Sequence, residues 1–185
     1  MIAGEDIVYE ARRERAFGYG NGAHTAWDLE SKITGRLPVV FANQDVKVVA
    51  TELKLYKRLT ENDWLVGKID WLGIHEKIGL IAGDHKTGTS HDNWQAPVYH
   101  FLTHVNIRPE IFPFDIDQKI KAVSPKQFWY TSLDKATNKT VVDIVKLTYP
   151  ENQEQWELPD ATTYTLGYNW IMTILSEIKS ELGLK

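Results

Sequence analysis

Apolar and polar residues alternate with a period of two through the middle of the chain. The segment 51–59 (TELKLYKRL) alternates apolar with charged residues, and the segment 64–74 (WLVGKIDWLGI) follows it after a polar turn. This period is typical of strands with one face in solvent. After a second polar turn, the apolar run 80–82 leads into 83–88 (GDHKTG). Together these segments predict three antiparallel strands in a meander.

Apolar residues at helical spacing predict helices before and after this meander. The segments 23–31 and 94–105 fit helices, and Asp92 or Asn93 is expected to cap the second one. The segment 165–182 fits a closing amphipathic helix. Its inward face is expected to carry Leu166, Trp170, Ile174, Leu175 and Ile178.

Two further strands and one further helix complete the predicted fold. The segments 127–132 and 140–147 are expected strands, and the segment 5–16 is an expected helix. Helices then flank a sheet, so the predicted class is α/β, of the α+β type, with a central mixed, mainly antiparallel sheet of about five strands. At 185 residues the chain is expected to form a single domain over 1–185.

The amino-acid composition limits the kinds of metal site, nucleophile and membrane segment that the chain can have. The chain has no cysteine, which excludes disulfides, thiolate-held iron–sulfur clusters and a cysteine nucleophile. Any metal must therefore use oxygen or imidazole ligands. Charged residues interrupt every apolar stretch well before the ~20 residues that a membrane span requires. The start of the chain, with Gly4, Glu5 and Asp6, lacks the basic region of an export signal, so a cytoplasmic protein without a membrane partner is expected.

The formal net charge of −4 argues against a protein that coats nucleic acid by bulk electrostatics. It does not exclude an enzyme that acts on DNA, because carboxylates that bind a cation also count as negative. Local basic clusters remain that could hold phosphates, and they consist of Arg12, Arg13 and Arg15 and of Lys119, Lys121 and Lys126.

Two aspartates and a lysine on the meander carry the strongest chemical signal. Asp70 lies on the predicted strand 64–74, and Asp84 lies at the end of the next strand. In a paired hairpin these positions fall close together, so two carboxylates can meet at one site. Mg²⁺ typically binds one or two carboxylates plus water and substrate phosphate. Lys86 projects from the same strand face as Asp84, and an ammonium beside metal-bound water suits phosphodiester hydrolysis.

These residues belong to a pattern that resembles a known nuclease superfamily. The chain has Gly67-Lys68-Ile69-Asp70, then Gly83-Asp84-His85-Lys86-Thr87-Gly88, then Gln95 and Tyr99. A GxxD strand, a DxKTG strand and a helix with QxxxY, in this order, resemble the RecB-like, phage exonuclease-like branch of the PD-(D/E)xK nucleases. The resemblance covers roughly residues 20–105. It implies a restriction-endonuclease-like core, here without an iron–sulfur cluster.

The resemblance also implies a set of metal ligands. Asp70 and Asp84 would bind one or two Mg²⁺ or Mn²⁺ ions, with the backbone carbonyl of His85 as a further ligand. This branch tends to have a histidine near the start of an upstream helix, and His24 fits that place as a metal ligand.

The catalytic set implied by the resemblance adds three residues to the two aspartates. Lys86 would orient or activate the attacking water. Gln95 and Tyr99 would line the site from the following helix and contact Lys86 or DNA.

The function implied is a metal-dependent DNA nuclease, expected to be an exonuclease in recombination, repair or phage DNA metabolism in a prokaryotic or phage-infected cell. Its substrate would be single- or double-stranded DNA, and the protein could act alone, as a homo-oligomer or as a subunit of a recombination or repair complex. The alternative is a non-catalytic DNA-binding or assembly subunit that retains the nuclease fold. The intact acids and lysine speak against that alternative.

Other residues suggest different kinds of site. His85, His91, His100 and His104 suggest zinc, but no HExxH pattern accompanies them. Glu52 could act as an outer-sphere acid or serve a structural role.

A third functional hypothesis rests on the tryptophans. Trp64, Trp71 and Trp129 could form an aromatic platform for a carbohydrate or a peptide. In a nucleic-acid enzyme, Trp94 or Trp129 could instead stack on an unpaired base.

Overall fold

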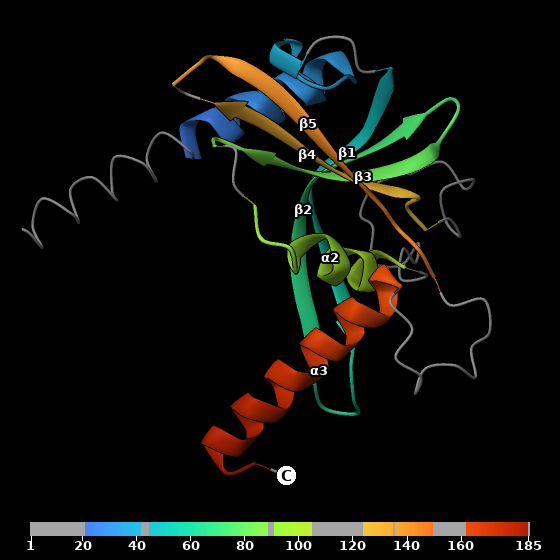
Figure 1. Cartoon of the computed structure of the whole chain (residues 1–185), viewed down its shortest axis with the longest axis vertical. Coiled ribbons are helices and arrows are strands. Elements are labelled where there is room, and N and C mark those ends of the chain that lie inside the picture. The colour runs from blue at the N-terminus through green and yellow to red at the C-terminus, as the bar shows by residue number, and fades with distance from the viewer. Residues whose placement is uncertain are drawn as a thin grey trace, which may run out of the picture.

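Five strands form one mixed sheet in the order β1-β2-β3-β4-β5 (Figure 1). The computed structural model describes residues 21–41, 45–88, 91–104, 124–134, 136–149 and 162–184. Neighbouring strands are antiparallel except β3 and β4, which are parallel. The mixed, mainly antiparallel sheet with flanking helices confirms the expected α+β class. The strands are β1 (Val46–Arg58), β2 (Trp64–His75), β3 (Gly79–Lys86), β4 (Gln127–Asp134) and β5 (Lys139–Lys146).

All five predicted strands are present, but β1 begins earlier than the alternating pattern indicates. It starts at Val46, whereas the alternation becomes regular only at residue 51. The register against β2 shifts between Val48 and Ala50, and this irregularity moves the buried positions from even to odd residues. A strand that changes face in its middle hides its first half from a search for a period of two.

Helices cover both faces of the sheet. Residues 21–34 are helical and lie on one face, together with the short 3-10 helix η1 (Val39–Phe41), whereas α2 (Gln95–Thr103) and α3 (Thr163–Leu182) lie on the other (Figure 1). The predicted helix 5–16 and the basic clusters, apart from Lys126, fall outside the described residues. Within the described part of the chain, no helix is long and apolar enough to cross a membrane.

The predicted cap of α2 is wrong. Trp94 occupies the N-cap position and its side chain makes no capping hydrogen bond. The carbonyl oxygen of Asp92 instead accepts a hydrogen bond from the backbone N–H of Gln95, at 3.1 Å. The backbone turn before the helix thus supplies the hydrogen bond that a side chain of Asp92 or Asn93 was expected to supply.

The core has one main cluster on each face of the sheet. Leu80 and Ala82 pack toward α2, whereas Ile81, between them, packs on the opposite side with Trp71 and Trp129. This alternation follows from the pleat of β3. Because the next positions along β3 keep the same alternation, Asp84 is expected on the α2 side and His85 on the side of helix 21–34.

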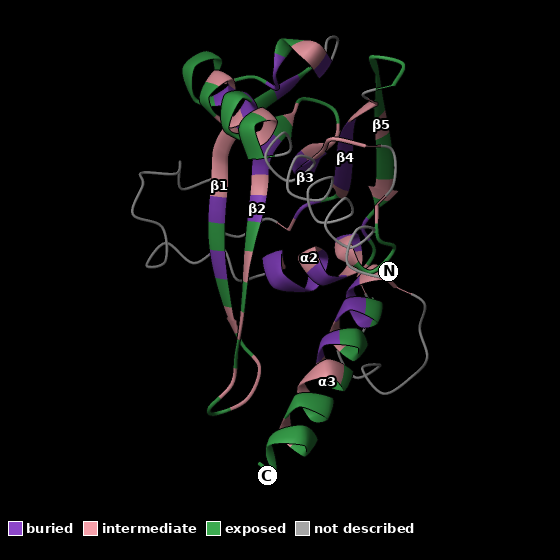
Figure 2. Cartoon of the chain, turned by 90° about the vertical axis from the view of Figure 1, so that its left-hand side faces the viewer, coloured by how far each residue is buried: buried purple, intermediate pink, exposed green. Residues whose placement is uncertain are grey.

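The prediction for the buried face of α3 is wrong. Of the five residues expected to face inward, Leu166 is 50% exposed, Trp170 38% and Ile178 47%, while Ile174 and Leu175 are only partly buried. The buried residues are Tyr164, Thr165, Gly167 and Ile171. Close approach at a glycine, rather than a wide apolar stripe, sets the packing, and the last turns of α3 extend past α2 into solvent (Figure 2).

Substitution at Gly167 tests this packing. A Cβ atom there would lie 2.0 Å from the backbone oxygen of Pro97. Gly167→Ala is expected to lower the free energy of unfolding by about 1–3 kcal/mol in urea denaturation, because α3 must move away from α2. Gly22→Ala is the matched control, since a Cβ there meets no atom within 4 Å. Equal stability of the two variants would contradict the close approach.

Buried polar groups gather where α2 meets α3. His100 is 2% exposed and its Nδ1 lies 2.7 Å from Thr163 Oγ1. Lys57 donates to the carbonyl oxygen of Phe101 at 2.7 Å, which satisfies a terminal carbonyl of α2. Burial lowers the pKa of Lys57 to about 8. Burial, together with the nearby charges of His104 and Lys57, lowers the pKa of His100 to about 3.

The lowered pKa of His100 makes the free energy of unfolding depend on pH. Below about pH 6.5 the unfolded chain protonates this histidine while the folded chain does not, so stability is lost as the pH falls from 6.5 toward 3. His100→Gln is expected to make the free energy of unfolding less steep between pH 6.5 and 4.5, by up to about 1.4 kcal/mol per pH unit. Urea titrations at several pH values measure the slope. An unchanged slope, whatever the change in stability at neutral pH, would refute this account.

Candidate active site

The β2–β3 ladder ends at the two aspartates singled out by the sequence. The last registered pair is Trp71 with Gly83, so Asp70 and Asp84 occupy the next position, where the strands part. Asp70 Oδ2 accepts a hydrogen bond from the backbone N–H of His85 at 2.8 Å. A side chain therefore takes the place of a strand partner at this point, and the ladder ends without leaving that donor unsatisfied.

Strands β1 and β2 bend at the same level. Glu52 has a positive φ of 51°, a conformation that non-glycine residues adopt rarely. On β2, a regular pleat would place Ile69 and Trp71 on one face, yet they belong to core clusters on opposite faces. The bend lets the lower half of the β1–β2 hairpin leave the sheet and run beside α2 and α3 (Figure 1).

Asp84 is buried and is held by two neighbouring side chains. It is 5% exposed, and its Oδ1 accepts a hydrogen bond from Gln95 Nε2 at 3.1 Å. Lys86 Nζ forms an ion pair with Oδ2 at 2.6 Å, and Oδ2 has no regular hydrogen bond within the described chain. Burial, together with the negative charge of Asp70, raises the pKa of Asp84 to about 6. Lys86 and Gln95 thus compensate the charge of this carboxylate only in part, because its pKa stays raised.

The pKa of Asp70 is shifted in the opposite direction. Burial opposes its ionisation, but His24 and the backbone N–H of His85 outweigh burial and lower its pKa. His24 Nδ1 lies 3.3 Å from Asp70 Oδ2, and this contact raises the pKa of His24 against the effect of its partial burial. Asp70 therefore loses its proton at a lower pH than Asp84, and burial together with the charge of Asp70 makes Asp84 resist ionisation.

Gln95 and Tyr99 project from α2 toward β2 and β3. Gln95 lines the site and contacts Asp84. The hydroxyl of Tyr99 donates to the backbone oxygen of Lys68 at 2.7 Å. Burial and the charges of the two aspartates raise the pKa of Tyr99 to about 12, so its hydroxyl keeps its proton and acts as a donor. These contacts fix α2 against the bent part of β2.

Tyr130, which the sequence patterns do not single out, holds α2 at the site. In the β3–β4 register Tyr130 lies beside Asp84. Its hydroxyl accepts a hydrogen bond from Ala96 N at 3.0 Å and donates one to the carbonyl oxygen of Asp92 at 3.3 Å. Only the parallel pairing of β3 and β4 reveals this role, and the spacing of residues in the sequence gives no signal for it.

The imidazole of His85 lies away from the carboxylates. It is 3% exposed, its Nδ1 lies 2.6 Å from Thr131 Oγ1, and it stacks on Phe41 with ring centroids 5.3 Å apart. Burial lowers its pKa to about 4, so the ring is neutral. The ring therefore serves the packing beneath helix 21–34, and only the backbone of His85 faces Asp70.

The residues present suit a hard divalent cation better than a soft one. Asp70 and Asp84 offer carboxylate oxygens, the donors that Mg²⁺ and Mn²⁺ prefer, and among the described residues the buried Asp84 Oδ2 has only the Lys86 ammonium beside it. In the described ranges no group of three or more histidine, aspartate and glutamate side chains is arranged to hold a metal ion. The candidate ligand set is therefore the two aspartates, with His24 beside Asp70.

The histidines that suggested zinc, and Glu52, make other contacts. His91 stacks on Tyr130, and the Nδ1 atoms of His100 and His104 face hydroxyl groups, so the four histidines do not form one cluster among the described residues. Glu52 forms an ion pair with Lys68.

The hypothesis of a tryptophan platform is wrong. Trp71 is fully buried and Trp129 is 3% exposed, because both fill the core under helix 21–34, whereas Trp64 is 56% exposed. Trp129 is therefore also unable to stack on a base. Trp94 is 41% exposed and stacks on Trp170, with ring centroids 4.7 Å apart.

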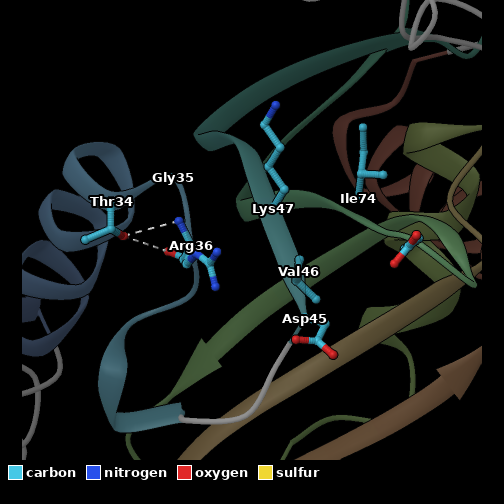
Figure 3. Close-up of a pocket in the computed structure, with 8 residues that line it drawn as sticks. Thr34, Gly35, Arg36, Asp45, Val46, Lys47 and Ile74 are labelled. Carbon is cyan, nitrogen blue, oxygen red and sulfur yellow. Dashed lines mark hydrogen bonds between the residues drawn. The ribbon is translucent and has the colours of Figure 1, made fainter.

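A separate cavity of about 670 Å³ lies at the start of β1 (Figure 3). Its lining carries both signs of charge, with Arg36 and Lys47 beside Asp45 and Glu76. Thr34 closes one side through hydrogen bonds with Arg36. None of the residues at the end of the β2–β3 ladder lines this cavity.

Comparison with known proteins finds matches among solved structures. No family model matches the chain, and no curated protein matches it either. The fold is similar to a solved structure described as "Crystal structure of SSO0001", with a TM-score of 0.44 and 14% sequence identity. The similarity covers 90% of this chain and 69% of that one.

Proposed function

We propose that the protein hydrolyses phosphodiester bonds in DNA with the help of a divalent cation bound by Asp70 and Asp84. The observation that carries the proposal is the adjacency of the buried Asp84, whose pKa is raised to about 6, and the partly buried Asp70. Adjacent carboxylates that repel each other gain most from a cation. The resemblance of the motifs to RecB-like nucleases supports the same reading.

Each neighbouring group has a role in this proposal. The cation, when bound, supplies positive charge for the phosphate and acidifies a water molecule. Lys86, whose ammonium is paired with Asp84 at 2.6 Å, would orient the attacking water. Gln95 fixes the orientation of the Asp84 carboxylate, and His24 with the His85 N–H fixes that of Asp70. Positioned charge of this kind is the main source of catalysis in phosphoryl chemistry.

Substitution of the acid and the lysine tests the proposal. Asp84→Asn and Lys86→Ala are each expected to lower the cleavage rate of end-labelled DNA by at least about 100-fold. Asp45→Asn and Lys47→Ala are matched controls, because this pair has the same spacing and lies at the separate cavity. Asp84→Asn should melt no lower than the unmodified protein, since it removes a carboxylate that burial disfavours. Full activity in Asp84→Asn would refute the proposal.

The dependence on metal is a separate prediction. EDTA is expected to abolish cleavage, and Mg²⁺ or Mn²⁺ to restore it. Isothermal titration calorimetry is expected to detect Mn²⁺ binding to the unmodified protein and not to Asp84→Asn. Cleavage that persists in EDTA would exclude the metal-dependent mechanism, and Mn²⁺ binding that is equal in both proteins would exclude this site.

A non-catalytic DNA-binding or assembly subunit is the second candidate. One observation favours it: both carboxylates already have a cationic neighbour within the chain, Lys86 at 2.6 Å and His24 at 3.3 Å. Such contacts could keep the acids in place without a metal. DNA binding without cleavage under Mg²⁺ and Mn²⁺ would favour this candidate over the nuclease.

A further inference from the structure

The lower half of the β1–β2 hairpin has one exposed face with an unusual composition. Side chains there alternate between the core and solvent, as the purple and green bands along β1 show (Figure 2). The inward positions include Leu53, Leu55 and Ile69 of the main core cluster. We name the solvent side the hairpin face, and it consists of Lys54, Tyr56, Arg58, Trp64, Val66 and Lys68.

The strand register places the residues of the hairpin face in three rows. Lys54 lies opposite Lys68, Tyr56 opposite Val66, and Arg58 opposite Trp64. Two large apolar side chains of this face are about half exposed, Trp64 at 56% and Val66 at 49%. Cations and aromatic rings therefore alternate along one continuous strip of a chain whose net charge is −4.

The charges on this face are only partly neutralised. Arg58 donates to the backbone oxygens of Thr60 and Glu61, which fixes the guanidinium over Trp64 at 6.0 Å from the ring centroid, and it has no carboxylate partner in the described part of the chain. Lys54 Nζ lies 5.4 Å from the Tyr56 ring centroid and likewise lacks an ion pair there.

The acidic groups near the hairpin face are mostly engaged elsewhere. Lys68 pairs with Glu52 at the upper end of the strip. In the turn between β1 and β2, Asp63 is paired with Lys179 of α3 at 2.9 Å. Glu61 belongs to the same turn. Positive charge therefore predominates on the strip itself.

We propose that the hairpin face binds single-stranded DNA and leads it to the carboxylates. Aromatic rings that stack on unpaired bases, with cations that follow the phosphates, are the common means of binding a single strand. A duplex hides its bases in the stack, so it would use the cations but not Tyr56 and Trp64. A protein partner would have to cover three cations within its contact, and lysine is depleted at protein interfaces. This inference rests on the proposed nuclease function and specifies its substrate.

The hairpin face is continuous with the candidate active site. Lys68 is two residues from Asp70 on β2, and its partner Glu52 lies on β1 at the level where both strands bend. From Asp70 to Trp64 the strand is about 20 Å long at 3.3 Å per residue. That length accommodates up to about six nucleotides at 3.4 Å or more for each phosphate. A strand lying on this face would therefore reach the carboxylates with one of its phosphates.

Binding in the absence of metal tests the proposal apart from cleavage. Fluorescence anisotropy in EDTA measures the affinity of a short labelled oligothymidylate and of a duplex of the same length. The double variant Tyr56→Ala, Trp64→Ala is expected to weaken single-strand binding at least tenfold. The double variant Lys54→Gln, Arg58→Gln is expected to reduce the slope of log affinity against log salt by about 1.4, the value for two lost phosphate contacts.

Two control variants match these changes. Lys139→Gln with Lys146→Gln removes two exposed cations from β5, and Trp170→Ala removes an exposed tryptophan from α3. Both are expected to bind the oligothymidylate as the unmodified protein does. Equal affinity of the hairpin variants and the controls would overturn the proposal, and so would an unmodified protein that binds the duplex as tightly as the single strand.

The outcomes separate this inference from the proposed function. If the unmodified protein cleaves DNA and the hairpin variants bind and cleave normally, the nuclease stands and the hairpin face has no part in it. If no metal supports cleavage while the hairpin variants alone lose single-strand binding, the binding surface stands and the catalytic proposal falls.

Discussion

The repulsion between Asp70 and Asp84 is the constraint on which the candidate site depends. The β2–β3 ladder ends beside them, and burial keeps water from screening their charges. The neighbouring groups compensate the two carboxylates unequally. His24 and a backbone N–H favour the charged form of Asp70, whereas the pKa of Asp84 stays raised. The proposed function rests on this pair of neighbouring acids with opposite pKa shifts.

The surrounding fold holds these acids in one geometry. Tyr130 joins β4 to the start of α2, and α2 in turn places Gln95 on Asp84 and Tyr99 on the backbone of β2. On the other face, the ring of His85 packs under helix 21–34 and leaves its backbone N–H for Asp70. The bend at Glu52 then directs the hairpin away from the sheet. Carboxylates fixed on a rigid sheet by neighbouring side chains suit the positioning that the proposed hydrolysis requires.

Local patterns were sufficient for most of the fold and for placing the residues of the candidate site near one another. The period of two revealed the strands, and the spacing of Asp70, Asp84 and Lys86 indicated that they would meet. Long-range packing was beyond those patterns. The apolar residues of α3 predicted a buried stripe, but the approach of Gly167 to Pro97 turned Leu166 and Trp170 outward. Tyr130 and the hairpin face likewise depend on strand register, which no single segment of the sequence encodes.

A crystal of the protein soaked in Mn²⁺ gives the most direct test of the central claim. The account predicts an anomalous peak between Asp70 and Asp84, with an oxygen from each carboxylate about 2.0–2.2 Å from the ion. The ammonium of Lys86 should then move from its ion pair with Asp84 toward a water bound to the ion. The absence of a peak at saturating Mn²⁺, or a peak bound by only one of the two aspartates, would contradict the claim that they share one cation.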